Sequence, residues 1–327
     1  MAFSNTYDTT NTGSAVSNRE DLSDALSILA PQETPFLSMA AKEKATATYH
    51  EWTVDSLAAP VTTGIAEGAD VTAYTDKFAN RARLGNYCHT RRRDFMVSNI
   101  QNAVDSVGPA KIAQAETKAV KEIKRDFEAI HMGTQDRAAE DGAGTAYTSR
   151  GLGDWIDSAG PSDVPSAYRT PSGSIHASST FTETVLNGLI TSIYRTNGMS
   201  NSLTLIADTA LRAVITGFTK TSADTTPAYR NITQSADSGS LRFSVEMYHS
   251  DNGVVSIVNM NPDCAPDTTN KDTGYLINWD YVATADLIPL GSQRAPNLGG
   301  GDRGWVDMTS TLVVKHPGAL GKITVLS

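Results

Sequence analysis

The feature that most limits how this chain can fold is residues 46–98, which have the pattern of a long hairpin but few apolar side chains. Residues 49–54 and 84–97 are rich in strand-forming side chains, and a turn-rich tip lies between them at residues 64–70. A two-stranded hairpin on its own is at best marginally stable in water. The sequence therefore predicts that this hairpin is either mobile or covered by a partner.

The rest of the chain has enough apolar side chains for a sizeable core. Of the 327 residues, 39% are hydrophobic and 19% are charged, which excludes wholesale disorder and corresponds to one large domain or two ordinary ones. The longest helix is expected over residues 109–132, where Pro109 suits the first turn and apolar side chains recur at spacings of three and four. Shorter elements are expected as helices at 19–29, from the capping pair Thr180 and Glu183 onward and at 208–218, and as strands at 203–207, 241–247, 254–260, 275–279, 309–314 and 322–326. This mixture predicts an α+β fold.

Six basic residues follow one another in the second half of the hairpin stretch, with no acidic residue between them. They are Lys77, Arg81, Arg83, Arg91, Arg92 and Arg93. Three interpretations are open: a solvated surface, contact with nucleic acid, and docking on an acidic neighbouring subunit. Nucleic-acid contact is less favoured, because only Phe78 and Tyr87 supply aromatic rings among the basic residues. Docking is favoured, because the hairpin cannot bury itself and the chain has 36 acidic residues to offer.

The overall charge and the cysteine content exclude some classes of protein. The chain has 27 basic and 36 acidic residues and a formal charge of −9, which argues against gripping nucleic acid as its main task. Two cysteines, Cys88 and Cys264, allow at most one disulfide, so the reducing cytosol is the expected compartment. No stretch approaches the roughly 18 to 20 apolar residues of a membrane span, and no secretion signal is visible. We therefore expect no membrane association.

No catalytic, cofactor-binding or metal-binding motif is recognisable. The six histidines do not form the helical pair with a central glutamate that zinc proteases use, and neither a nucleophile elbow nor a phosphate loop occurs. Gly299, Gly301 and Gly304 match a dinucleotide fingerprint in spacing, but they lead into a strand-like segment where that fingerprint needs a helix. We expect a loop there, and we predict a protein without catalytic residues, cofactor or metal.

Two motifs, PQETPFLSM at residues 31–39 and ATATYHEWTVDSL at residues 45–57, are followed by shorter ones along the chain. The shorter ones are Gly85-Asn86-Tyr87, Val97-Ser98, KEIKRDFE at 121–128, Gly151-Leu152 with Trp155-Ile156, and the segments 311–314 and 321–323. In this order they resemble a group of major capsid proteins of tailed bacteriophages, which have the Hong Kong 97 capsid fold. The resemblance covers most of the chain. It is strongest over 31–156 and weakest over 157–300.

The resemblance implies an α+β, Hong Kong 97-type capsid fold with an N-terminal arm, an extended β-hairpin loop, a peripheral domain with a long spine helix, and an axial domain. The implied ranges are 1–45 for the arm, 46–98 for the extended loop, 99–179 for the peripheral domain with its spine helix at 109–132, 180–290 for the axial domain, and 291–327 for the return to the peripheral domain. The extended loop would reach over an adjacent subunit, which agrees with the shortage of apolar side chains in the hairpin.

The resemblance also implies a function: self-assembly through hexamers and pentamers into an icosahedral shell that encloses double-stranded DNA without reading its sequence. The protein would belong to the virion and be assembled in the cytoplasm of a host bacterium. Its further partners would be a portal, a decoration protein and a scaffolding protein, the last expected as a separate chain because the arm begins almost at Met1. We predict that the subunit interface includes three apolar anchors and the six basic residues: Phe36, Leu37, Trp52, Lys77, Arg81, Arg83, Arg91, Arg92 and Arg93.

The best-known member of this fold crosslinks a loop lysine to an asparagine of a neighbour. Lys77 and Asn297 occupy loosely similar regions, but no motif aligns them, so we expect no crosslink. Two other functions stay open. One is an encapsulin-like compartment of the same fold, which would enclose cargo proteins in place of a genome. The other is a monomeric β-rich hydrolase or glycan-binding domain, which would leave the long hairpin without a purpose.

Overall fold

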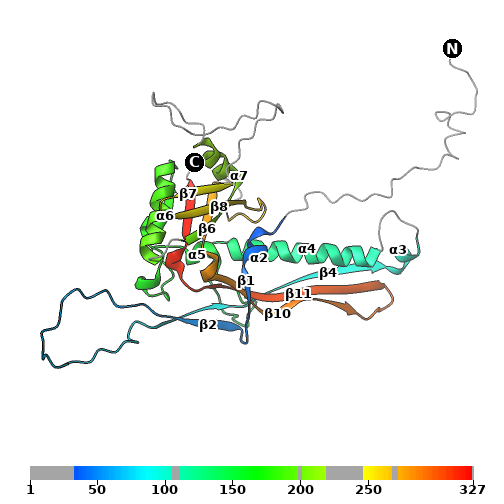
Figure 1. Cartoon of the computed structure of the whole chain (residues 1–327). Helices are drawn as coiled ribbons and strands as arrows, with labels where there is room; N and C mark the ends of the chain where they lie inside the picture. The colour runs from blue at the N-terminus through cyan, green and yellow to red at the C-terminus, as the bar shows by residue number, and fades with distance from the viewer. Residues whose placement is uncertain (1–32, 105–110, 198–200, 219–245, 267–271, 326–327) are drawn as a thin grey trace, which may run out of the picture.

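The structure is a computed structural model that describes residues 33–104, 111–197, 201–218, 246–266 and 272–325. The helix predicted at 19–29 and most of the strand predicted at 241–247 lie outside these ranges. The described part is elongated: two β-sheets with their helices form the body, and a narrow hairpin projects from it (Figure 1). The mixture of helices and sheets confirms the α+β prediction.

A four-stranded sheet and the long helix α4 (Lys111–Met132) form one half of the body (Figure 1). The strands lie in the order β1, β10, β11, β4, with bounds Ala41–Lys44, Val282–Ala295, Gly301–Val314 and His89–Ser98. On α4, Ala119, Ile123 and Phe127 follow one another at a spacing of four and pack against Phe95 and Val306 of the sheet. The apolar periodicity thus explains the helix, and the predicted spine helix is confirmed from residue 111 onward.

A six-stranded sheet and two helices form the other half. The strands lie in the order β5, β12, β9, β6, β8, β7, with bounds Ile175–Ser178, Gly321–Val325, Thr273–Ile277, Asn201–Ala207, Gly253–Asn259 and Met247–Ser250. Helices α6 (Glu183–Asn197) and α7 (Thr209–Gly217) contribute leucines and isoleucines to the same core as this sheet. Asp208 caps α7 by accepting a hydrogen bond from the backbone of Thr209, as its place before the helix predicts.

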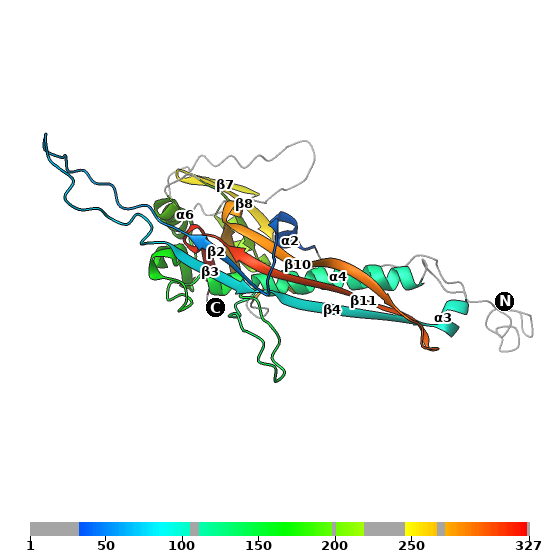
Figure 2. The ribbon, with the colours of Figure 1, turned by 90° about the horizontal axis from the view of Figure 1, so that it is seen from below.

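The hairpin consists of β2 (Tyr49–Val54) and β3 (Ala82–Tyr87), an antiparallel pair separate from both sheets. Residues 55–81 between them form neither helix nor strand and project from one end of the molecule (Figure 2). The prediction that residues 84–97 form the second hairpin strand is wrong beyond Tyr87. From His89 the chain continues as β4, because ten consecutive residues of β11 offer it a complete partner and Phe95 is buried beneath α4.

The strands of the two sheets alternate along the sequence, and the predicted domain ranges do not reproduce this order. Because β10 begins at Val282, residues 282–290 lie in the four-stranded sheet, although the sequence grouped them with residues 180–290. Strand β12, near the end of the chain, pairs in parallel with β5 and antiparallel with β9, so it belongs to the six-stranded sheet. Each half of the body is thus built from distant parts of the chain.

The remaining elements are short. They are α2 (Pro35–Met39), α3 (Asn99–Ala103), α5 (Leu152–Trp155), η1 (Ser166–Tyr168), η2 (Ser172–Ser174), η3 (Trp279–Tyr281) and η4 (Pro317–Ala319). Both cysteines are buried and free. Among the described helices, none has the length and apolar content needed to cross a bilayer.

Candidate subunit interface

The projecting part of the hairpin, residues 55–81, carries apolar side chains that nothing in the described chain covers. Their exposed fractions range from 64% for Phe78 to 98% for Leu57, and the set is Leu57, Val61, Ile65, Val71, Tyr74 and Phe78. We call these six residues the hairpin tip cluster. Single exposed apolar side chains are common on monomers, but several on one projecting loop are typical of a surface that a partner covers.

The other end of the molecule also exposes apolar side chains. Met96, at the end of β4, is 68% exposed, and Ile100 and Val104 in and after α3 are 79% and 51% exposed. Leu298, in the turn between β10 and β11, is 79% exposed. We call these four residues the distal cluster. Figure 2 shows α3 and the β10–β11 turn at the end opposite the hairpin.

Three of the predicted basic residues lie on the hairpin, where their ion pairs are local. Arg81 contacts Asp55 at 3.3 Å, and Arg83 contacts Glu51 at 3.6 Å. The Arg81 guanidinium also lies 4.5 Å from the centre of the Phe78 ring. Exposed ion pairs of this kind stabilise the folded protein by only about 0–1 kcal/mol. These arginines, like Lys77, therefore stay available to pair with a neighbour.

The other three basic residues, Arg91, Arg92 and Arg93, lie on β4 and not on the hairpin. Arg93 donates two hydrogen bonds of 2.8 Å to Asp126 of α4, and these bonds raise its pKa. Arg92 contacts Asp307 at 3.2 Å, and Arg91 lies 3.9 Å from Asp126. These three arginines therefore neutralise acidic side chains of their own chain, and their role as docking groups stays a prediction.

The predicted apolar anchors also make contacts within the chain. Phe36 has no exposed surface; its ring lies 5.5 Å from Trp279 and 6.1 Å from His131, centre to centre. Leu37 is half-buried against the core between α4 and the four-stranded sheet. Trp52 packs on Trp155 and donates a hydrogen bond of 3.1 Å to the carbonyl oxygen of Val314. In this structure these residues fasten the N-terminal segment and the hairpin to the body.

A buried carboxylate completes the attachment of the N-terminal segment. Glu128 of α4 accepts hydrogen bonds from the backbone N–H groups of Phe36 at 2.8 Å and Leu37 at 2.9 Å. These are orphan donors of the first turn of α2, which the side chain of Thr34 does not cap. Burial raises the pKa of Glu128 to about 7, although the two N–H bonds oppose that shift.

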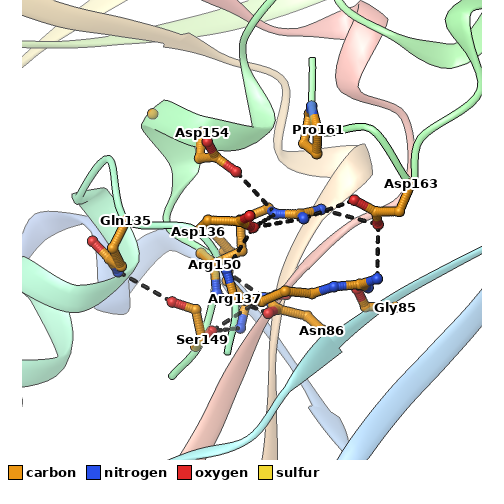
Figure 3. Close-up of polar contacts among 12 residues, drawn as sticks. Gly85, Asn86, Gln135, Asp136, Arg137, Ser149, Arg150, Asp154, Pro161 and Asp163 are labelled. Carbon is orange, nitrogen blue, oxygen red and sulfur yellow. Dashed lines mark hydrogen bonds and ion pairs between the residues drawn. The ribbon is translucent and has the colours of Figure 1, made fainter. Parts of the chain in front are cut away.

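The root of the hairpin is held by a cluster of charged side chains around Arg150 (Figure 3). The side chain of Arg150 is 2% exposed and binds Asp136 at 2.7 Å, Asp154 at 2.9 Å and Asp163 at 2.8 Å. Arg137 contacts Oδ2 of Asp163 at 3.0 Å, and Arg150 also donates to that oxygen, at 3.3 Å. Burial raises the pKa of Asp163, but its bonds with Arg150 and the charges of both arginines lower it by more, so this carboxylate stays charged.

Sequence patterns gave no sign of this root cluster or of Glu128. The arginines and aspartates are spread over loops between residues 136 and 163, at spacings that match no motif. Glu128 falls on the charged stretch of α4, where the helical pattern suggests a solvated side chain. The only available signal is that Arg150 directly precedes the apolar segment 151–156, which the structure buries almost completely.

The sequence predicts no catalytic or binding role for the histidines, and His131 and His89 are packing groups in the structure. Burial lowers the pKa of His131 to about 3 and also lowers that of His89, which keeps both rings neutral in the core. Gly299, with a positive φ angle, lies in the turn between β10 and β11, but Gly301 begins β11 and Gly304 lies within that strand, so the predicted loop is wrong beyond residue 300. Within the described residues, no group of three or more His, Cys, Asp or Glu side chains could hold a metal ion.

The arrangement of a long helix on one sheet, a second sheet with two helices and a projecting hairpin is shared by solved structures of capsids and of an encapsulin. The capsid protein of Cyanophage P-SCSP1u shares this arrangement with a TM-score of 0.61 and 12% identity, over 99% of this chain and 98% of that one. The SrpI encapsulin of Synechococcus elongatus PCC 7942 shares it with a TM-score of 0.58 and 10% identity, over 96% and 94%. The predicted Hong Kong 97-type fold is confirmed.

Residues 4–327 match the SU10 major capsid protein family, and the chain belongs to that family. The major capsid protein of Escherichia phage Phieco32 is 33% identical to it over 114 residues. That match covers 34% of this chain and 32% of the Phieco32 protein, about a third of each. The prediction of a bacteriophage major capsid protein is confirmed: the chain is a structural protein of a viral capsid.

Proposed function

We propose that copies of this chain assemble through hexamers and pentamers into a closed icosahedral shell around double-stranded DNA, with each hairpin lying across a neighbouring subunit. The observation that carries the proposal is the hairpin tip cluster, six exposed apolar side chains on a segment without regular structure. Burying such side chains contributes about 25 cal/mol per Å² of apolar surface, and no described part of the chain covers them.

The two ends of the molecule suggest how neighbours meet. The hairpin tip cluster and the distal cluster lie at opposite ends, so one subunit's hairpin can cover a different surface on the next subunit. Contacts between unlike surfaces form closed rings when the rotation between subunits closes. Such rings are the hexamers and pentamers of the proposal. The predicted role of residues 1–45 as an arm belongs to this proposal. So do the axial domain without residues 282–290 and the return to the peripheral domain without β12.

The charge of the chain suits a shell wall. A net charge of −9 keeps the protein from binding DNA tightly along its surface, so packaged DNA would stay free to move. Assembly in a host bacterium and contact with portal, scaffolding and decoration proteins are further parts of the proposal, and they rest on the family alone.

We expect the triple variant Leu57→Ser, Ile65→Ser and Tyr74→Ser to fold but not to form particles, because it removes most of the apolar surface of the hairpin tip. Light scattering after size-exclusion chromatography, followed by electron microscopy, measures the outcome. The matched control is Leu57→Met, Ile65→Val and Tyr74→Phe, which keeps the apolar area and is expected to assemble. Wild-type particle yield from the serine variant would contradict the proposal.

We expect reversal of the hairpin charges, with Lys77, Arg81 and Arg83 all changed to Glu, to slow or prevent assembly. These side chains would then be negatively charged and would repel the acidic groups of the neighbour. Wild-type assembly should weaken as salt is raised above about 0.15 M, where the Debye length is about 8 Å. The control keeps the charge, with both arginines changed to Lys. Salt-independent assembly together with normal yield from the reversed variant would exclude the docking role.

A cargo compartment is the second candidate, because the SrpI encapsulin shares the fold over most of the chain. The two functions differ in what the shell holds. Native particles that protect double-stranded DNA from nuclease support the viral capsid, whereas particles that hold protein and no nucleic acid support the compartment.

A further inference from the structure

The hairpin is attached to the body at its root by the packing of Trp52 and Leu84 in the core and by a small set of polar contacts. Asn86 of β3 donates to the carbonyl oxygen of Leu312 at 2.8 Å, and its own carbonyl accepts from the backbone of Arg150 at 2.8 Å. Tyr168 donates to the carbonyl oxygen of Asn80, just before β3 begins. Beyond this root, residues 55–79 make no hydrogen bond or ion pair with the described residues of the body, so the contacts at the root set the direction in which the hairpin leaves.

Arg137 is placed to control that direction because it touches both hairpin strands at once. Its guanidinium donates to the hydroxyl of Tyr49 on β2 and to the carbonyl oxygen of Gly85 on β3. It also lies 5.1 Å from the centre of the Tyr49 ring. Gly85 makes this arrangement feasible, since a Cβ atom there would lie 2.7 Å from the Tyr49 ring.

The body holds Arg137 through a shared carboxylate. Arg150 donates to both oxygens of Asp163, Arg137 contacts the one that is Oδ2, and Arg150 also binds Asp136 and Asp154 (Figure 3). The Arg150 side chain is 2% exposed and that of Asp163 is 28% exposed, so the ion pair between them is screened by salt less than a surface pair is. A planar guanidinium that binds a carboxylate with several donors holds one orientation, which a single flexible ammonium would not.

We propose that Arg137, held by Asp163 and Arg150, is a positioning residue that fixes the direction of the hairpin so that it meets the neighbouring subunit during assembly. This inference rests on the proposed function, in which the hairpin lies across a neighbour. If Arg137 is lost, the hairpin samples other directions. If it then spends about a tenth of its time in the productive one, the apparent affinity between subunits falls about tenfold.

The experiment measures hairpin direction and assembly separately in the full-length chain. Nitroxide labels go on Gly64→Cys at the hairpin tip and on Lys118→Cys on α4, both of which have open surroundings. The two natural cysteines are buried, which protects them from the reagent. Pulsed electron spin resonance on unassembled protein then gives the distribution of distances between the labels. The expected result for Arg137→Met is a broader or shifted distribution, together with a lower particle yield and about a tenfold loss of apparent affinity between subunits.

Two further variants separate positioning from simple loss of structure. Arg212→Met removes a hydrogen bond to the side chain of Asn259, which lies on β8 and outside the hairpin and its root cluster. It should weaken the contact between α7 and β8 without broadening the distance distribution. Tyr49→Phe removes only the hydroxyl that Arg137 binds and should broaden the distribution less than Arg137→Met does. It keeps the test decisive if Arg137→Met fails to fold.

The possible results are distinct. An unchanged distribution in both Arg137→Met and Tyr49→Phe overturns the proposal, and so does a broader distribution with wild-type particle yield. A broadening in Arg212→Met equal to that in Arg137→Met also overturns it, because the effect would then be general. If the wild-type chain itself forms no particles, the proposed function fails, and the spin-label distances still report what Arg137 does to the hairpin.

Discussion

Replacing Phe36 with alanine is expected to lower the free energy of unfolding by about 3–5 kcal/mol, the range for a fully buried phenylalanine. Phe36 has no exposed surface and lies between the rings of Trp279 and His131. The three residues come from α2, η3 and α4, so the truncation leaves a cavity where three parts of the chain meet. None of them can fill it without moving its own backbone.

Urea unfolding of the full-length chain, followed by tryptophan fluorescence, measures this loss. The matched control is Met39→Ala on the same short helix, where the side chain is 42% exposed and a loss below about 1 kcal/mol is expected. Equal losses for both variants would show that Phe36 does not anchor α2. A stable Phe36→Ala chain that no longer assembles would instead return Phe36 to the subunit interface, where the sequence placed it.

Local sequence patterns were sufficient for the elements whose structure is set by neighbours along the chain. The apolar face of α4 repeats every three or four residues, the cap at Asp208 lies beside its helix, and the turn between β7 and β8 has an Asp-Asn-Gly sequence. In each case the interactions that decide the structure span fewer than about ten residues, and propensity can report them.

The same patterns failed where the partner is distant. The chain passes from the hairpin to the four-stranded sheet at Cys88, whose N–H donates to Thr48 while the next residue, His89, pairs with Ser310. Nothing near residue 88 distinguishes a continued hairpin from a change of sheet, since both need the same strand-forming side chains. Three of the predicted docking arginines were therefore assigned to the hairpin when they lie on β4.

The sequence could predict that the hairpin meets a partner, but it could not predict which residues form the interface. A hairpin too poor in apolar side chains to fold alone predicts a partner, and the exposed hairpin tip cluster agrees with that expectation. Trp52 and Phe36 were chosen because they are large and apolar, but such residues fill a core as readily as an interface. The root cluster could not be predicted, because its charges meet only after the loops between residues 136 and 163 have folded.

The carboxyl group of Glu128 is expected to make stability depend on pH. Burial raises its pKa in the folded protein to about 7, against an ordinary value of 4.5. The folded state therefore holds the proton more tightly than the unfolded state does. The resulting stabilisation is fully present below pH 4.5 and is lost as pH rises through about 7. A shift of this size corresponds to about 3 kcal/mol.

Glu128→Gln isolates this effect, because glutamine has nearly the same shape and does not titrate. We expect the free energy of unfolding of the wild type, minus that of Glu128→Gln, to fall by about 3 kcal/mol between pH 4.5 and pH 8. Urea unfolding of both chains at half-unit pH steps gives this difference directly. Titration of other carboxylates and histidines affects both chains alike and cancels.

The neighbours of Glu128 do not produce the same signal. The thiol of Cys264 interacts electrostatically with Glu128. Burial raises the pKa of that thiol to about 11. His131, one turn further along α4, is kept neutral by burial, which lowers its pKa to about 3. Both groups are therefore neutral from pH 4.5 to 8. A difference that does not change with pH would mean that Glu128 is charged throughout, and that the two N–H bonds from α2 outweigh its burial.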